Sequence, residues 1–400
     1  MTNIKGVNLI ASLLLGAGLT LSGYSAAGQE TMLELLKVLR DNGSLSNQEY
    51  DLLMKAAAQD QPTVSEIAVA PKTNDKTSWT ESVKLKGDLR LRYQHQSEDG
   101  SVDRDRGRIR YRLGIEAKPS EGWKVGAGLA SGGSDLRSTN QSFDSSFSTK
   151  GINLDYAYAQ YSFNDQLKVI GGKFKRKAYL WQTTDLVWDG DINPEGVSAS
   201  YIHSSDLGTT FANAGLWILE ENSSSEEDAK LAYLQIGQKM SDGDVFGTVA
   251  GTYYGYSEIN ALGDIATEGS NTDYEFDAIS ISAEVGLKNA FGEGSKASLI
   301  ADWINNIDTN TSEDSGFAFG IKLAKGPWSG KYIYADLETN AVPDIFPDSD
   351  RFDGLTGIDG HEIAVNYKLQ KNVTLGLDYY TTDRGDINQD LLQLDLVVKY

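Results

Sequence analysis

The sequence has no cysteine, only seven prolines and only three histidines in 400 residues. The absence of cysteine excludes disulfide bonds and thiolate metal sites, and it suits a chain that crosses an oxidising periplasm. The histidines, His95, His203 and His361, lie far apart and match no zinc-binding spacing. No nucleophile elbow is present either. The sequence therefore predicts no catalytic residues, and neither a metal ion nor a cofactor.

Long hydrophobic runs are absent after the N-terminal region. No later segment reaches the roughly 18 uninterrupted apolar residues that a membrane-spanning helix needs. The formal net charge is −21, and this acidity argues against a nucleic-acid-binding protein. The charge is uneven, because acidic clusters lie in the expected loops while the first expected strands are basic.

The N-terminal region contains a secretory signal followed by short helices. Lys5, an apolar stretch and small residues up to Ala27 predict a signal peptide over residues 1–27. Two capping-box patterns, at 31–34 and 46–49, predict a helical hairpin or coiled-coil segment over 28–58. This segment is either a small plug or cap, or a site where three copies associate. The polar residues 59–81 are expected to form a linker.

Strict alternation begins at residue 82 and determines the predicted fold. Apolar or small residues occupy every second position of 83–94, and charged or polar residues lie between them; residues 108–117 repeat the pattern. Alternation with period two places one set of side chains on each face of a strand. Two such strands of about a dozen residues, apolar on one face and charged on the other, fit a transmembrane β-hairpin.

The same alternation predicts further strands throughout residues 82–400. Short connections alternate with long ones, as expected where short turns lie at one rim of a barrel and long loops at the other. We therefore predict an all-β fold: a transmembrane antiparallel β-barrel of about 16 strands, with 14 or 18 as alternatives, and a short N-terminal periplasmic helical segment. The predicted strands are 82–95, 104–118, 123–131, 151–163, 167–174, 195–204, 208–220, 229–240, 244–257, 274–288, 295–307, 315–326, 328–339, 359–369, 372–383 and 389–400.

One face of the first two strands is strongly basic. If the apolar face contacts lipid, these cations line the interior, where rows of charged side chains select ions. Two interpretations remain open: the cations attract solutes, or carboxylates from loops neutralise them. The predicted pore-lining residues are Lys84, Lys86, Arg90, Arg92, Arg108, Arg110 and Arg112.

The segment KFKRKAYLWQTTDLVWDGDINPEG, residues 173–196, resembles the corresponding stretch of the putative porins of Gram-negative bacteria. The helical segment ELLKVLRDNGSLSNQEYDLL, residues 34–53, also resembles the N-terminus of these porins and of phosphate-selective porins. The resemblance implies a homotrimer of 16-stranded, water-filled channels in the outer membrane, in contact with lipid and lipopolysaccharide. It names no transported solute.

The same segment follows the fifth predicted strand, and in general porins the loop at this place folds inward and narrows the pore. Opposed cations and carboxylates in it would produce a transverse field across a constriction. Its aromatic residues fit an external lid equally well. The predicted constriction-loop residues are Lys173, Lys175, Arg176, Lys177, Asp185, Asp189 and Asp191.

Two further loops, around 220–228 and 344–359, are acidic. We expect solvated surface charge there, with divalent-cation bridging to lipopolysaccharide as the alternative. Taken together, the sequence predicts an outer-membrane porin that lets small hydrophilic solutes or ions diffuse passively. The alternatives are an adhesive or structural barrel, and a secreted β-sandwich that binds carbohydrate.

Overall fold

The computed structural model describes residues 82–400, except 224–226, 263–270, 272–274 and 309–311, and six residues of the N-terminal region. The chain divides into two units, Met1–Asp75 and Lys76–Tyr400. The six N-terminal residues are helical: Lys37, Arg40, Asp41, Asn47, Tyr50 and Asp51. The guanidinium of Arg40 lies 4.5 Å from the ring centre of Tyr50, so the two predicted helices are in contact. The predicted signal peptide and linker lie outside the described residues.

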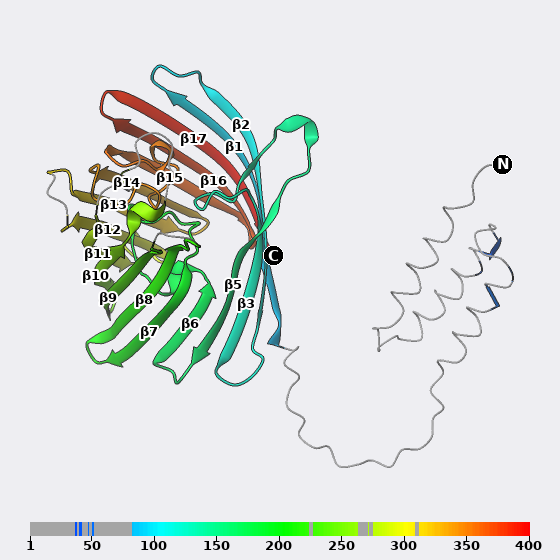
Figure 1. Cartoon of the computed structure of the whole chain (residues 1–400), viewed down its shortest axis with the longest axis horizontal. Coiled ribbons are helices and arrows are strands. Elements are labelled where there is room, and N and C mark those ends of the chain that lie inside the picture. Colours follow the sequence, from blue (N-terminus) through cyan, green and yellow to red (C-terminus); the bar gives the residue numbers. More distant parts are fainter. Residues whose placement is uncertain are drawn as a thin grey trace, which may run out of the picture. The chain divides into compact units, whose positions relative to one another are not determined.

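The second unit is a closed antiparallel β-barrel of 16 strands (Figure 1). Each strand pairs with its neighbours along the chain, and β1 pairs with β17 to close the ring. A seventeenth element, β4 (Gln141–Ser142), is a short strand within a loop. The barrel strands are β1 (Lys84–Glu98), β2 (Arg104–Ala117), β3 (Trp123–Ser131), β5 (Ile152–Ser162), β6 (Leu167–Lys173), β7 (Glu195–Ser205), β8 (Gly208–Glu220), β9 (Ala229–Asp242), β10 (Val245–Ser257), β11 (Asp277–Lys288), β12 (Ser295–Asn306), β13 (Ser315–Lys325), β14 (Trp328–Leu337), β15 (Ile358–Gln370), β16 (Val373–Arg384) and β17 (Ile387–Lys399).

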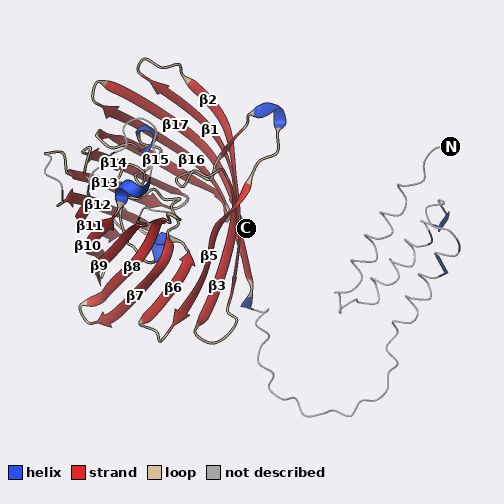
Figure 2. Cartoon of the chain, in the orientation of Figure 1, coloured by secondary structure: helices blue, strands red, loops and turns tan. Residues whose placement is uncertain are grey.

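The predicted fold is confirmed. All 16 predicted strands are present, with ends that differ from the prediction by no more than three residues. The β-sandwich alternative is wrong, because every strand belongs to one closed sheet. Connections at one rim, which we call the short-turn rim, contain few residues, and those at the opposite long-loop rim are mostly longer (Figure 2). Among the described residues, no helix is long and apolar enough to cross a lipid bilayer.

Alternation separates the two faces of the barrel wall. On β1 the side chains of Leu85 and Leu91 are 68% and 42% exposed, whereas those of Arg92 and Gln94 are only 6% and 2% exposed. Aromatic pairs such as the exposed Trp328 and the half-buried Tyr367, with ring centres 4.6 Å apart, lie at the short-turn rim. An outer face of leucine, valine and aromatic side chains matches the lipid-contacting surface of a barrel. The polar faces therefore line the interior.

The C-terminal residue completes the barrel seam. The backbone carbonyl oxygen of Tyr400 accepts a hydrogen bond from the amide of Gly87 at 3.0 Å, and the amide of Tyr400 donates to the carbonyl oxygen of Gly87 at 3.1 Å. The ring of Tyr400 lies where a β-carbon on Gly87 would approach to 2.6 Å, so position 87 accepts only glycine in this arrangement. The hydroxyl of Tyr400 donates to the carbonyl oxygen of Arg112 at 2.9 Å.

Two long loops, 174–194 and 338–357, build a hydrophobic core inside the barrel. Trp188 of the first loop stacks on Phe346 of the second, with ring centres 4.5 Å apart, and contacts Trp217 of β8 at 5.4 Å. The strand residues of this core come from β6 to β15, and none comes from β1, β2, β16 or β17. The core therefore fills one side of the interior and leaves open space beside β1 and β2.

Candidate functional site

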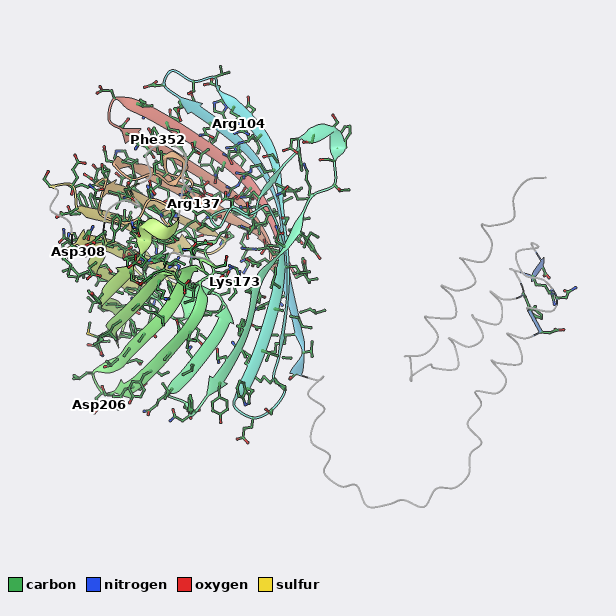
Figure 3. All side chains as sticks on the ribbon, in the orientation of Figure 1. Arg104, Arg137, Lys173, Asp206, Asp308 and Phe352 are labelled. Carbon is green, nitrogen blue, oxygen red and sulfur yellow. The ribbon has the colours of Figure 1, made fainter. Side chains whose placement is uncertain are left out.

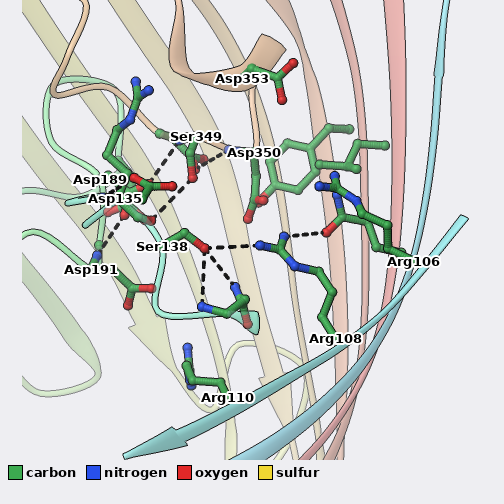
Figure 4. A pocket seen from close by; sticks show the side chains of 18 of the residues that line it. Arg106, Arg108, Arg110, Asp135, Ser138, Asp189, Asp191, Ser349, Asp350 and Asp353 are labelled. Carbon is green, nitrogen blue, oxygen red and sulfur yellow. Dashed lines mark hydrogen bonds between the residues drawn. The ribbon is translucent and has the colours of Figure 1, made fainter. Parts of the chain in front are cut away.

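A cavity of about 540 Å³ lies between the basic strands and the inward loops (Figure 4). Arginines of β1 and β2 lie on one side of the cavity. We call them, together with the other inward cations of these two strands, the arginine wall. On the other side stand carboxylates of loops 132–151, 174–194 and 338–357. The charged lining residues are Arg90, Arg104, Arg106, Arg108, Arg110, Arg137, Asp135, Asp185, Asp189, Asp191, Asp348, Asp350 and Asp353.

Part of the arginine wall is neutralised by carboxylates on β1 and β17. Asp88 of β1 accepts hydrogen bonds from Arg110 at 2.9 Å and Arg112 at 2.8 Å. Asp395 of β17 is bidentate with Arg92, at 2.7 and 2.8 Å, and lies 3.6 Å from Arg90. Both carboxylates are strand residues, and not the loop carboxylates of the second interpretation that the sequence left open.

The arginines nearer the long-loop rim form no ion pair with a carboxylate among the described residues. Arg106 and Arg108 donate to the neutral side chains of Gln96 and Gln94, each at 2.9 Å. Among the described residues no carboxylate lies within 4 Å of Arg104, Arg106 or Arg108. Arg104 and Arg106 were not among the predicted pore-lining residues, although they continue the alternation that identified Arg108. Figure 3 labels Arg104 on this upper part of β2.

The predicted residues Lys84 and Lys86 lie near the short-turn rim and do not line this cavity. Lys86 pairs with Glu116 of β2 at 2.7 Å, and Lys84 is exposed at the first position of β1. Arg92 and Arg112 also lie behind the cavity lining, held by their carboxylate partners. The cations that border open space are thus Arg90, Arg104, Arg106, Arg108 and Arg110 on the wall.

Loop 174–194 crosses the barrel interior and is held at its tip. The carboxylate of Asp302 on β12 accepts hydrogen bonds from the backbone amide and hydroxyl of Thr184, both at 2.6 Å, and from the hydroxyl of Thr183 at 2.9 Å. Lys322 of β13 donates to the carbonyl oxygen of Thr183 at 2.9 Å. These contacts lie on the inward faces of β12 and β13, across the barrel from β1 and β2. The loop therefore lies inside the barrel and is not an external lid.

The predicted constriction-loop cations have local partners. Lys173, the last residue of β6, pairs with Glu195 at 2.8 Å, and Lys175 pairs with Asp155 at 2.7 Å. Arg176 is buried and donates to the carbonyl oxygens of Trp188 and Asp189 at 3.1 and 3.0 Å. Neither lysine borders the main cavity, and Arg176 stabilises the loop conformation.

The carboxylates of the same loop do border the cavity. Asp185 lies 3.8 Å from Lys177, and Asp191 lies 3.4 Å from Arg112. Asp189 is buried where the two loops meet and accepts a hydrogen bond from the backbone amide of Ser349 at 3.0 Å. Burial is the main cause that raises the pKa of Asp189 to about 7, and the nearby negative charges of Asp191 and Asp350 act in the same direction.

Loop 338–357 borders the cavity, which the sequence did not predict. Its acidic residues were expected to be solvated, and this is wrong for Asp344 and Asp348, which are only 2% and 9% exposed. Burial raises the pKa of Asp348 well above its ordinary range. Asp350 accepts a hydrogen bond from Gln393 of β17 at 2.7 Å and lies 3.8 Å from Arg92. The loop thus extends from the core to the arginine wall.

Loop 132–151 contributes a further cation. Arg137 donates to the carbonyl oxygens of Asp344 and Gly354, at 3.1 and 3.0 Å. Gly354 has a φ of +81°, and a β-carbon there would approach a guanidinium nitrogen of Arg137 to 2.1 Å. Only glycine fits this turn and this close approach. Three loops from separate parts of the chain therefore shape one cavity.

Comparisons with known proteins agree with this architecture. The sequence model of the family described as "Putative porin" matches residues 97–289 and 269–400. OprB of Pseudomonas putida, solved at high pH, has a TM-score of 0.57 at 11% identity, covering 80% of this chain and 95% of that chain. A triple mutant of the Rhodopseudomonas blastica porin has a TM-score of 0.47 at 12% identity, covering 80% and 100%. No curated protein sequence matches the chain.

Proposed function

Since the chain belongs to the putative porin family, we propose that it is an outer-membrane channel through which small hydrophilic solutes and ions diffuse passively. The observation that carries the proposal is the open, charged space beside β1 and β2. It is bordered by arginines on one side and by loop carboxylates on the other. Hydrophobic core lies on the other side of the loops, so solutes would enter beside the arginine wall.

The residues at this passage suggest how solutes are handled. Arg104, Arg106 and Arg108, which have no carboxylate partner in the part of the chain that the structure describes, present donors that suit carboxylate and phosphate groups. Asp350 and Asp353 border the same space. An arrangement of this kind attracts charged groups of either sign to opposite sides and orients dipolar solutes as they pass. We propose that loop 174–194, together with loop 338–357, narrows the channel.

The proposal extends to assembly and surroundings. We propose a homotrimer, with the apolar outer wall in contact with lipid and lipopolysaccharide and with the long loops outside the cell. Support for the outer-membrane setting is the exposed apolar face of the strands and the family. Cross-linking of the detergent-purified protein tests the trimer: a ladder that ends at three copies supports it, and a single-copy band alone contradicts it.

Ion conduction across planar bilayers tests the function. Purified, folded protein is expected to give stable steps of current in potassium chloride that persist without any energy source. Heat-denatured protein from the same preparation is the control. If the folded protein inserts and carries no current, the channel proposal is wrong and a structural or adhesive barrel is the better account.

A further inference from the structure

Two more cavities continue the first one through the barrel. The second, of about 390 Å³, lies at the tip of loop 174–194 and shares Asp185 with the main cavity. The third, of about 480 Å³, lies between β11 and β16. The second and third cavities share two lining residues, Lys322 of β13 and Lys331 of β14. The three cavities therefore form a series, and these two lysines lie where the last two cavities meet.

The charge of the lining changes along this series. Six cations and seven carboxylates line the main cavity, so the charges there nearly balance. Only Asp185 opposes the four cations that line the second cavity: Arg176, Lys177, Lys322 and Lys331. Three lysines and two carboxylates line the third cavity, so the largest excess of positive charge among the three cavities lies at the loop tip, away from the arginine wall.

The two shared lysines differ from the paired arginines of the wall. Lys322 donates one hydrogen bond, to the carbonyl oxygen of Thr183, and among the described residues it has no carboxylate within 4 Å. Lys331 pairs with Glu362, but Glu362 also pairs with Arg351 at 2.6 Å. One carboxylate therefore serves two cations. An ammonium group has three donors, so both lysines keep donors for a passing solute.

We propose that Lys322 and Lys331 form a transit site for small oxyanions, and that this site sets the anion preference of the channel more than the arginine wall does. The inference rests on the proposed channel function. Carboxylate and phosphate groups are the ligands that such a site would take, because they accept several hydrogen bonds and carry the opposite charge. Weak, transient contacts of this kind let an anion enter and leave.

The double variant Lys322→Gln and Lys331→Gln tests the proposal in planar bilayers under a potassium chloride gradient. The anion-to-cation permeability ratio, read from the reversal potential, should fall about fivefold or more, the factor expected for one unit charge about 4 Å from an ion in water. Millimolar inorganic phosphate should reduce the wild-type chloride current and reduce that of the variant much less. Lys325→Gln, on the same strand but outside the three cavities, is the matched control and should behave as wild type.

The outcomes separate this inference from the channel function. If wild-type protein carries no current, the proposed function fails and the inference fails with it. If wild-type protein conducts and the double variant keeps the wild-type permeability ratio and phosphate sensitivity, only the inference fails. If Arg106→Gln and Arg108→Gln lower the ratio more than the lysine variants do, the arginine wall sets the preference and the inference is overturned.

Discussion

The guanidinium group of Arg92 on β1 and the carboxylate of Asp395 on β17 form a bidentate ion pair, with distances of 2.7 and 2.8 Å. The two residues lie 303 positions apart in the chain, and their strands are the first and last of the barrel. Both side chains are buried, at 4% and 8% exposure. The pair therefore connects the two ends of the sheet at the place where the barrel closes.

Replacing Arg92 by glutamine should weaken this closure. The variant leaves Asp395 buried beside Arg90 alone, at 3.6 Å, and loss of one partner of a buried pair costs about 3 kcal/mol. On a gel, the band of the folded variant should convert to the band of the heat-denatured protein at a clearly lower temperature than the band of the folded wild type does. Arg104→Gln is the control, because Arg104 has no carboxylate partner among the described residues. Equal conversion temperatures for both variants would show that the pair does not stabilise the seam.

Asp302 should hold loop 174–194 in place. Asp302→Ala removes the acceptor of the hydrogen bonds from Thr183 and Thr184, and each hydrogen bond to a charged group contributes about 2 kcal/mol. A released loop tip should increase the single-channel conductance and the noise of the open channel. Ser298→Ala, at an inward position of the same strand, is the control. Unchanged conductance and noise in Asp302→Ala would contradict the role of this contact.

Ion selectivity should depend on pH through Asp189. The pKa of this carboxyl is raised to about 7 by burial, and the charged groups that face it include Asp191, Asp348 and Asp350. As the pH falls from about 8 to about 6, Asp189 gains a proton and the loop side of the cavity loses negative charge. The anion-to-cation permeability ratio should therefore rise as the pH falls through 7.

Asp189→Asn separates this effect from other titrations. The variant is uncharged at every pH, so the change in the permeability ratio between pH 6 and pH 8 should be much smaller than in wild type. Because the pKa in the folded protein lies above the ordinary value of 3.8, protonation of Asp189 also stabilises the folded loop, and this stabilisation is lost as the pH rises through about 7. A pH dependence identical to that of wild type would show that Asp189 does not titrate in this range.

The strands of this protein could be predicted from the sequence because their signal is local. The alternation of Leu91 with Arg90 and Arg92 depends only on which face meets lipid, and the same pattern repeats around the barrel. The family, inferred from residues 173–196, is confirmed by the match over 97–400. Arg104 and Arg106 could have been included, since they share the face of Arg108 in a strand that was predicted.

The loops could not be predicted because their contacts are distant in the chain. Thr183 is held by Asp302, 119 positions away, and nothing near either residue indicates the partner. Asp344 and Asp348 have the sequence of a solvated loop, yet both are buried, and Asp344 accepts a hydrogen bond from the backbone amide of Asn271, 73 positions away. Lys322 and Lys331 carry no distinctive signal in the sequence of their strands, and only the cavities show that both residues line the same two spaces.

The most direct test of the central claim uses the absence of cysteine from the chain, since a single introduced thiol is then the only one present. Ser138→Cys places a thiol on the main cavity, and Ala341→Cys places one in the interior core, where the residue is fully buried. A charged methanethiosulfonate reagent added to conducting channels should reduce the current of Ser138→Cys promptly and leave that of Ala341→Cys unchanged. Block at Ala341→Cys with no effect at Ser138→Cys would place the solute path through the core and contradict the account.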